Sequence, residues 1–198
     1  MSDFSRLPPE LRSPVELELQ SGERIVWMDQ PIPGRIARSA WPLVMFGIPW
    51  TAFSLFWIVM ATKGVASSKD AGPFWLFPLF GLPFVLIGFG MLSGPYWAKR
   101  GARRTAYVLT DRRAIIFKAS GRGSMNVRSF EPGALTELNR TQYPDGAGDL
   151  VFTEDLRRGS KGRTYTTRIG FMAVRDVKSV EEMVRTLASR AVVKRDPA

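Results

Sequence analysis

The side chains that carry most acid–base and nucleophilic chemistry in proteins are missing from this chain. Its 198 residues include no His and no Cys. This composition excludes a Ser-His-Asp triad, a Cys-His pair, a disulfide framework and a metal held by imidazole or thiolate. Carboxylates such as Asp149, Glu154 and Asp155 remain, so an enzyme with a carboxylate site is the alternative. The leading prediction is a protein with no catalytic residue, no cofactor and no metal.

Positive charge is concentrated in one part of the chain. The formal net charge is +10, and between Lys99 and Arg128 nine cationic residues accompany a single acid, Asp111. Beside a bilayer, each such cation would add about 1 kcal/mol of attraction to anionic headgroups. The predicted headgroup contacts are Lys99, Arg100, Arg103, Arg104, Arg112 and Arg113. Retention of cations in the cytoplasm explains the pattern equally well without a specific lipid. No nucleic-acid-binding motif accompanies the charge, so nucleic acid is not an expected partner.

Two long stretches, 39–62 and 71–98, contain no charged residue. A helix needs about 20 mostly apolar residues to cross about 30 Å of hydrocarbon. A core helix of this length would usually show a polar side, and a signal peptide would lie at the extreme N-terminus. The second stretch is rich in Pro and Gly, which bilayers tolerate, and kinks are expected at Pro78 and Pro83. The sequence predicts membrane spans at about 39–62 and 72–98.

The cations around the two spans predict the topology. Lys and Arg crowd the outer flanks, whereas the loop between the spans holds only Lys63 and Lys69. Because cations are retained inside, both termini are expected in the cytoplasm. The predicted domains are a cytoplasmic arm (1–38), a transmembrane helical hairpin (39–98), a cytoplasmic domain (99–191) and a tail (192–198).

Gly90 and Gly94 lie one helical turn apart in the second span. Small residues at this spacing let helices approach closely in a bilayer. The spacing predicts packing of the second helix on the first within the hairpin. Packing between copies, in a homo-oligomer, is the alternative.

The segment after the second span has the pattern of a small β-rich domain. Short β-prone runs separated by turn residues occur at 105–110, 114–119, 125–130, 135–143, 149–153 and 163–169, and residues 155–162 are predicted as a loop. From Ser179, paired with Glu182 in a capping box, the apolar period becomes helical, with Val184 and Leu187 on the apolar face. The predicted fold class is α+β: a barrel or sandwich of six or seven strands, capped by a C-terminal helix and attached to a two-helix transmembrane hairpin.

Three motifs occur in an order that resembles bacterial pleckstrin-homology-like membrane proteins. They are GERIVW at 22–27, YVLTDRR at 107–113 and GFMAVRDV at 170–177. The resemblance covers about residues 22–191 and implies a pleckstrin-homology-like barrel on a membrane hairpin. Eukaryotic relatives bind phosphoinositides through cations between the first two strands. We take the turn at 110–113 as that connection, and its two Arg are too few to carry the function over.

The resemblance implies binding and scaffolding, since this family of largely uncharacterised function includes assembly factors of membrane complexes. We therefore expect a non-enzymatic adaptor in the bacterial inner membrane. Its domain would bind a protein partner or anionic lipid headgroups, as an accessory subunit or assembly factor of a larger membrane complex. The alternative is a membrane enzyme with its carboxylates at the membrane face.

Overall fold

The structure is a computed structural model that describes residues 7–67, 72–120, 123–158 and 164–195. These residues form two compact units. The sheet unit comprises the described residues of Met1–Pro33 and Arg100–Ala198, and the hairpin unit comprises those of Gly34–Lys99. Most of the segment predicted as an arm at 1–38 thus belongs to the sheet unit.

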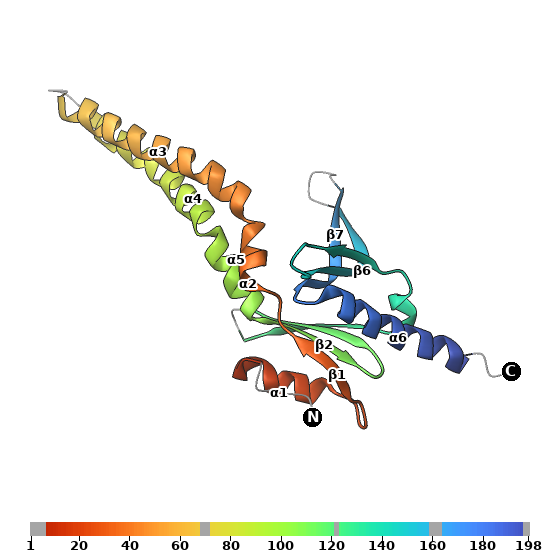
Figure 1. Cartoon of the computed structure of the whole chain (residues 1–198). Coiled ribbons are helices and arrows are strands. Elements are labelled where there is room, and N and C mark those ends of the chain that lie inside the picture. Colours follow the sequence, from red (N-terminus) through yellow and green to blue (C-terminus); the bar gives the residue numbers. More distant parts are fainter. Residues whose placement is uncertain (1–6, 68–71, 121–122, 159–163, 196–198) are drawn as a thin grey trace. The chain divides into compact units, whose positions relative to one another are not determined.

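The sheet unit contains two antiparallel sheets, with strand orders β1-β2-β3-β4 and β5-β6-β7 (Figure 1). The strands are β1 (Ile25–Asp29), β2 (Thr105–Thr110), β3 (Ala114–Ala119), β4 (Met125–Phe130), β5 (Asn139–Gln142), β6 (Gly148–Arg158) and β7 (Thr164–Val174). The strands predicted at 105–110, 114–119 and 125–130 are confirmed at both ends. The fold class is α+β, with the C-terminal helix predicted from the sequence.

The loop predicted at 155–162 is wrong for its first four residues. They continue β6, because the ladder with β7 runs on from Asp155 opposite Thr167 to Arg158 opposite Thr164. Residues 159–162 of that prediction lie outside the described residues.

The strand β2, inside the first sheet, is buried on both faces. On β2, Tyr107 and Leu109 belong to one core cluster, whereas Ala106 and Val108 belong to another. Every residue of β2 is consequently buried. Strands covered on both faces carry nearly continuous apolar runs instead of an alternating pattern, and β2 follows this rule.

The main core contains an aromatic cluster around Phe171, which is fully buried. Its ring centroid lies 4.8 Å from that of Phe152, 4.9 Å from that of Tyr107 and 5.3 Å from that of Trp27. Aromatic pairs at such distances add about 0.5–1.5 kcal/mol each beyond the area they bury. The cluster therefore ties β1, β2, β6 and β7 together.

The second core is covered by the N-terminal helix α1 (Pro9–Glu18), which the sequence analysis did not identify. Leu7, Leu11 and Val15 recur every four residues and are almost completely buried. They pack in one cluster with Ile115 and Phe117 of β3. Leu11 and Val15 lie on one side of the helix and Leu7 just precedes it, so α1 and its entry cover this core.

The C-terminal helix α6 (Val177–Arg195) begins two residues before the predicted start. The backbone N–H of Ser179 donates to the Asp176 carboxylate over 3.2 Å, so Asp176 caps the helix in place of the predicted Ser179. Val184 and Leu187 lie in the main core, which confirms that this face of α6 points inward.

Replacement of Leu187 by Ala should lower the free energy of unfolding by about 2–5 kcal/mol, the usual cost of emptying a buried Leu site. Chemical denaturation of the purified protein, followed by Trp fluorescence, measures the change. Ser189, exposed on the same helix, gives the control: Ser189→Ala should change the value by less than about 0.5 kcal/mol. Equal effects of the two substitutions would contradict the packing of α6 on the core.

The hairpin unit is built from helices that run side by side (Figure 1). The helices of this region are α2 (Pro33–Arg38), α3 (Trp41–Ser67), the 3-10 helix η2 (Gly72–Gly81), α4 (Leu82–Leu92) and α5 (Gly94–Arg103). The chain bends by 44° at the break between Leu92 and Gly94. Kinks were predicted instead at Pro78, which lies within η2, and at Pro83, which occupies the first turn of α4 where Pro fits without distortion.

The described residues contain one helix, α3, that is long and apolar enough to cross a membrane. A second candidate exists if the bent pair Leu76–Leu92 and Gly94–Arg103 is counted as one span.

Close packing in the hairpin depends on different glycines from those predicted. A Cβ at Gly88 would lie 2.2 Å from the Thr51 hydroxyl, and one at Gly81 would lie 2.4 Å from Ile58. A Cβ added at Gly90 would have no neighbour within 4 Å, and one added at Gly94 would make only an ordinary van der Waals contact with Leu43. The close approach of α3 to the end of η2 and to α4 therefore requires Gly81 and Gly88, whereas the predicted Gly90 makes no such approach.

Candidate functional site

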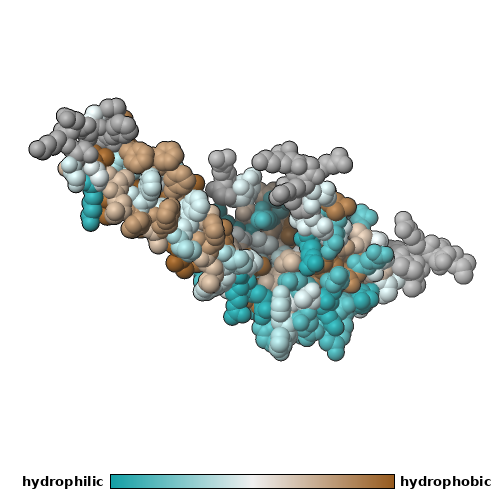
Figure 2. Space-filling view, turned by 90° about the horizontal axis from the view of Figure 1, so that it is seen from above, coloured by the Kyte–Doolittle hydropathy of each residue, from teal (hydrophilic) through white to brown (hydrophobic). Residues whose placement is uncertain are grey.

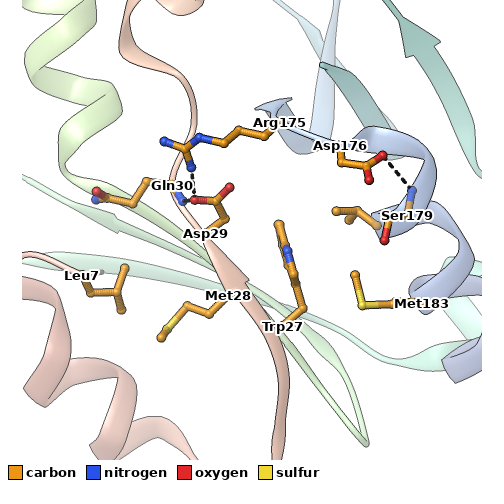
Figure 3. A pocket seen from close by; sticks show the side chains of 10 residues that line it. Leu7, Trp27, Met28, Asp29, Gln30, Arg175, Asp176, Ser179 and Met183 are labelled. Carbon is orange, nitrogen blue, oxygen red and sulfur yellow. Dashed lines mark hydrogen bonds and ion pairs between the residues drawn. The ribbon is translucent and has the colours of Figure 1, made fainter. Parts of the chain in front are cut away.

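A groove runs between strand β1 and helix α6 in the sheet unit. Its larger part, about 590 Å³, is lined by Trp27 and Asp29 on one side and by Asp176 and Met183 on the other (Figure 3). A second part, about 230 Å³, shares Met183 and is lined by Val26 and further residues of α6. We call the two parts together the β1–α6 groove.

Apolar side chains lie on both faces of β1 along this groove. Trp27 packs toward the main core, and Val180 and Met183 of α6 line the groove with it. Met28 packs toward the second core, where Leu7 lines the same groove. In Figure 3, Met28 and Leu7 lie on one side of the strand and Trp27 and Met183 on the other. The groove can therefore accept apolar groups on either face of the sheet.

Polar groups fix the end of the groove where β1 finishes. Arg175 donates to the Asp29 carboxylate, which joins β1 to the connection between β7 and α6 (Figure 3). The Gln30 side chain donates to the carbonyls of Arg103 and Thr105, over 2.9 and 3.2 Å. These contacts hold the end of β1 against the start of β2, so this wall of the groove is well supported.

The backbone beside Arg175 adopts an uncommon conformation. Ala173 has φ of 53°, in the left-handed region that non-glycine residues rarely adopt. Its N–H donates to the Asp149 carboxylate over 2.6 Å, and its carbonyl accepts from the N–H of Ile32 over 2.9 Å. Asp149 thus holds the last residues of β7 beside the groove, and its carboxylate has a structural partner.

The predicted headgroup contact Arg113 is engaged inside the sheet unit. Its guanidinium donates to both oxygens of Glu23, over 2.9 and 3.1 Å, and to the carbonyl of Glu18 over 2.8 Å. Only 13% of the Arg113 side chain and none of the Glu23 side chain is exposed. This pairing argues against the predicted headgroup role of Arg113, because its charge is neutralised by a carboxylate that is 90 residues away in sequence.

The electrostatics of Glu23 reflect competing effects. Burial alone raises the pKa of this carboxyl, but the Arg113 guanidinium, the Gln20 N–H and the Thr110 hydroxyl stabilise the charged form. Their net result is a pKa below the ordinary value of 4.5. Glu23 therefore stays ionised at neutral pH and clamps the chain entering β1 to the turn between β2 and β3.

The other predicted headgroup contacts are separated along the fold. Arg112 is exposed in the β2–β3 turn, with its guanidinium 3.5 Å from the Gln20 side-chain oxygen. Arg103 and Arg104 lie at the opposite end of β2, just before Thr105. The remaining two, Lys99 and Arg100, are exposed on α5. The structure thus does not bring all six predicted cations into one cluster.

The turn at 110–113 is also not the connection between the first two strands. It joins β2 to β3, because the segment 25–29 precedes them as β1. The connection between β1 and β2 is the whole hairpin unit with its flanking residues. The comparison with the phosphoinositide-binding connection therefore applied to the wrong turn.

The three candidate catalytic carboxylates do not converge. Asp149 holds the Ala173 amide, Glu154 pairs with Arg168 at 3.4 Å, and Asp155 pairs with Arg128 at 3.6 Å. Among the described residues, no group of three or more acidic side chains could hold a metal ion. Burial raises the pKa of the nearby Tyr107 to about 12, so its phenol remains protonated at neutral pH.

Comparison with known proteins gives one structural relative. No protein-family model matches the chain, and no curated protein matches it. A solved structure that does match is of a DUF1696 family protein with a pleckstrin-homology domain from Shewanella loihica PV-4. The match is to a bacterial pleckstrin-homology protein. It has 18% sequence identity and a TM-score of 0.31, and it covers 44% of this chain and 73% of the other. The motifs at 22–27, 107–113 and 170–177 pointed to the same kind of domain.

Sequence reasoning missed two parts of this site. The strand β1 lies within the motif at 22–27, where Ile25, Val26 and Trp27 are residue types enriched in strands. The Glu23–Arg113 pair carried no local signal, because nothing in the spacing of the two residues shows that they meet. The strand could have been predicted, whereas the ion pair could not.

Proposed function

We propose that this protein is a non-enzymatic adaptor anchored in the bacterial inner membrane by its helical hairpin. The sheet unit, with its pleckstrin-homology-like fold, offers a binding surface in the cytoplasm, where both termini lie. Its partner is a membrane protein or complex, which it serves as an accessory subunit or assembly factor.

The observation that carries the membrane anchor is the exposure of apolar side chains on the hairpin. Only 17% of the apolar window of α3 is buried, whereas a core helix of a soluble protein is mostly buried. Exposed large side chains of this unit include Phe46, Phe53 and Phe56 on α3 and Leu86 and Phe89 on α4. Figure 2 shows the resulting apolar surface along the hairpin. Soluble monomers rarely expose so large an apolar patch, which favours a lipid environment.

Polar side chains in the hairpin are satisfied in the way that hydrocarbon requires. Thr51 donates to the Gly47 carbonyl over 2.7 Å, and Ser54 donates to the Trp50 carbonyl over 2.8 Å. The Trp50 indole N–H donates to the Phe84 carbonyl across the two helices over 3.0 Å. Because unsatisfied polar groups cost several kcal/mol in a bilayer, this pattern supports spanning helices.

The topology is tested by reporter fusions in a bacterial host. A fusion after Ala198 should report the cytoplasm, and an insertion at Gly64, in the last turn of α3, should report the periplasm. The physical reason is the excess of cations on the outer flanks of the hairpin. Extraction at alkaline pH should leave the protein in the membrane fraction. A periplasmic signal from the C-terminus, or release of the protein by alkali, would refute the proposed anchor.

The arrangement of carboxylates favours the adaptor over the alternative enzyme. Glu154 and Asp155 are adjacent on one strand and therefore point to opposite faces of the sheet. Each pairs with a different arginine, and Asp149 accepts a hydrogen bond from the backbone of β7. In glycoside hydrolases, for example, catalysis needs two carboxyl groups that face the same substrate.

Anionic lipid is a second proposed partner, through the cations of α5. Lys99, Arg100 and Arg103 are exposed and immediately follow the apolar segment. If that segment spans the bilayer, chain connectivity keeps them near its surface, where each adds about 1 kcal/mol of attraction. Arg112 lies at the far end of the six-residue strand β2, about 20 Å along the chain direction, and is better placed for contact with a protein.

A further inference from the structure

We propose that the β1–α6 groove binds an extended segment of a partner protein, which adds as a further strand to the outer edge of β1. The inference rests on the proposed adaptor function and identifies the surface that the adaptor uses. Four features of the groove support it: an unpaired strand edge, apolar walls on both faces, an acidic rim and a supported end.

The outer edge of β1 has no backbone partner in the described part of the chain. β1 ends the first sheet, and its strand ladder pairs it with β2 alone. Natural proteins usually protect such edges with Lys, Pro, a strong bulge or a covering element. β1 has the sequence IVWMD, without Lys or Pro, and a single register shift between Ile25 and Trp27. Its free N–H and C=O groups are therefore available to another strand.

The walls of the groove suit the alternating side chains of an added strand. Successive residues of a strand point to opposite faces of the sheet. On one face they would meet Trp27 and Met183, and on the other they would meet Met28. Because apolar side chains line the groove on both faces, the segment should carry apolar side chains at consecutive positions. A segment that alternates polar and apolar residues would leave one wall unsatisfied.

The rim of the groove is acidic although the protein as a whole is strongly basic. The acidic lining residues are Asp29, Asp111, Asp176 and Glu182, and the basic ones are Arg175 and Arg190. Arg175 is already paired with Asp29. In a chain of formal charge +10, this local excess of carboxylates favours Lys or Arg on either side of the apolar segment.

The same charge argues against a second copy of this chain as the occupant. Pairing of β1 with β1 of another molecule would bring two acidic rims together, and like charges juxtaposed across an interface are unfavourable. We therefore assign the groove to a partner of different sequence, with a short apolar strand flanked by basic residues.

The experiment uses the full chain in nanodiscs of phosphatidylcholine, a lipid without net charge, and three fluorescent peptides. The probe is Lys-Lys-Val-Ile-Val-Ile-Lys-Lys. One control peptide has Pro at the second Val, which removes a backbone donor, and the other has Glu in place of every Lys. Fluorescence anisotropy measures affinity, and hydrogen exchange measures protection of residues 24–30 and, for comparison, of the other edge strand, β4.

We expect the probe to bind at least about tenfold more tightly than either control, a difference of about 1.4 kcal/mol. It should slow hydrogen exchange in β1 and leave β4 unchanged. Ser179 lines both parts of the groove and is exposed, so Ser179→Trp should block it and weaken binding at least about tenfold. Ser189→Trp, on α6 but outside the groove lining, should bind like the unmodified chain. The Glu182→Lys variant should bind the control peptide that carries Glu in place of Lys more tightly than the unmodified chain does.

Three results would overturn the proposal: no binding of the probe, equal binding of the Pro peptide, or protection that does not include β1. Thermal unfolding of the Ser179→Trp and Ser189→Trp variants checks that both are folded, and the Glu182→Lys variant tests the groove without adding bulk. If the probe peptide fails to bind but alkali leaves the protein in the membrane fraction, the proposed role of the groove is refuted and the membrane anchor is not. Binding by a chain that alkali releases from membranes would refute the anchor alone.

Discussion

Phe171→Ala is expected to lower the free energy of unfolding by about 3–5 kcal/mol, the range for removing a large buried aromatic side chain. Phe171 is fully buried and contacts the rings of Trp27, Tyr107 and Phe152. Its loss opens a cavity between the two sheets and removes three ring contacts at once. Chemical denaturation followed by circular dichroism measures the change.

The control for this substitution is Leu156→Ala. Leu156 lies on the neighbouring strand β6 and is 75% exposed, so its truncation should change the free energy of unfolding by less than about 0.5 kcal/mol. Trp27 also reports on the core, since its ring lies beside that of Phe171 and its fluorescence should shift in the Phe171→Ala variant. A loss below about 1 kcal/mol for Phe171→Ala would mean that the two sheets do not pack through this cluster.

Glu23→Gln is expected to lower the free energy of unfolding by about 3 kcal/mol at pH 7. The substitution keeps the shape of the side chain and removes its charge, which leaves the largely buried Arg113 guanidinium without its main partner. Breaking a buried pair in this way typically costs about 3–5 kcal/mol. Glu18, at 3.5 Å from Arg113, offsets part of the loss and places the expectation at the lower end of the range.

The pH dependence of stability supplies a second measurement on the same pair. The folded-state pKa of Glu23 lies below its ordinary value of 4.5. The contribution of Glu23 is therefore fully present above about pH 4.5 and is lost as the pH falls through the folded-state pKa. In the Glu23→Gln variant this part of the acid sensitivity should disappear, while Glu16→Gln, at an exposed position of α1, should retain it. An unchanged acid profile in Glu23→Gln would contradict the ion pair.

Together these two predictions test whether the N-terminal segment is integral to the domain. Trp27 reaches the main core from β1, and Glu23 joins the same segment to the β2–β3 turn. A domain that begins at residue 99 would lack the strand that forms one wall of the groove. The binding surface therefore depends on residues on both sides of the hairpin in sequence.

The local sequence pattern was enough to predict several strands and the C-terminal helix. The strands at 105–110, 114–119 and 125–130 were correct at both ends, because short β-prone runs alternate there with turn residues. The helical period after 179 predicted the buried positions Val184 and Leu187. In each case the signal lies within a few neighbouring residues, where steric and hydrophobic periodicity act directly.

Composition alone also predicted the two long apolar segments of the hairpin, since charged residues are absent over lengths that match a spanning helix. The packing of its helices could not be predicted in the same way. Gly90 and Gly94 had the expected spacing, yet Gly81 and Gly88 make the close approaches to α3. Spacing places small residues on a face of a helix, but the rotation of that helix against its neighbour decides which face is buried.

Contacts between distant segments could not be read from sequence order. Ile25–Asp29 pairs with β2 across an insertion of some 75 residues, and Glu23 meets Arg113 across 90. A strand of five residues acquires its stability from the neighbour it pairs with, and an ion pair acquires its strength from the burial that the fold provides. The β1–α6 groove exists for the same reason: its walls come from opposite ends of the chain and are brought together only by the packing of the two sheets and the terminal helix.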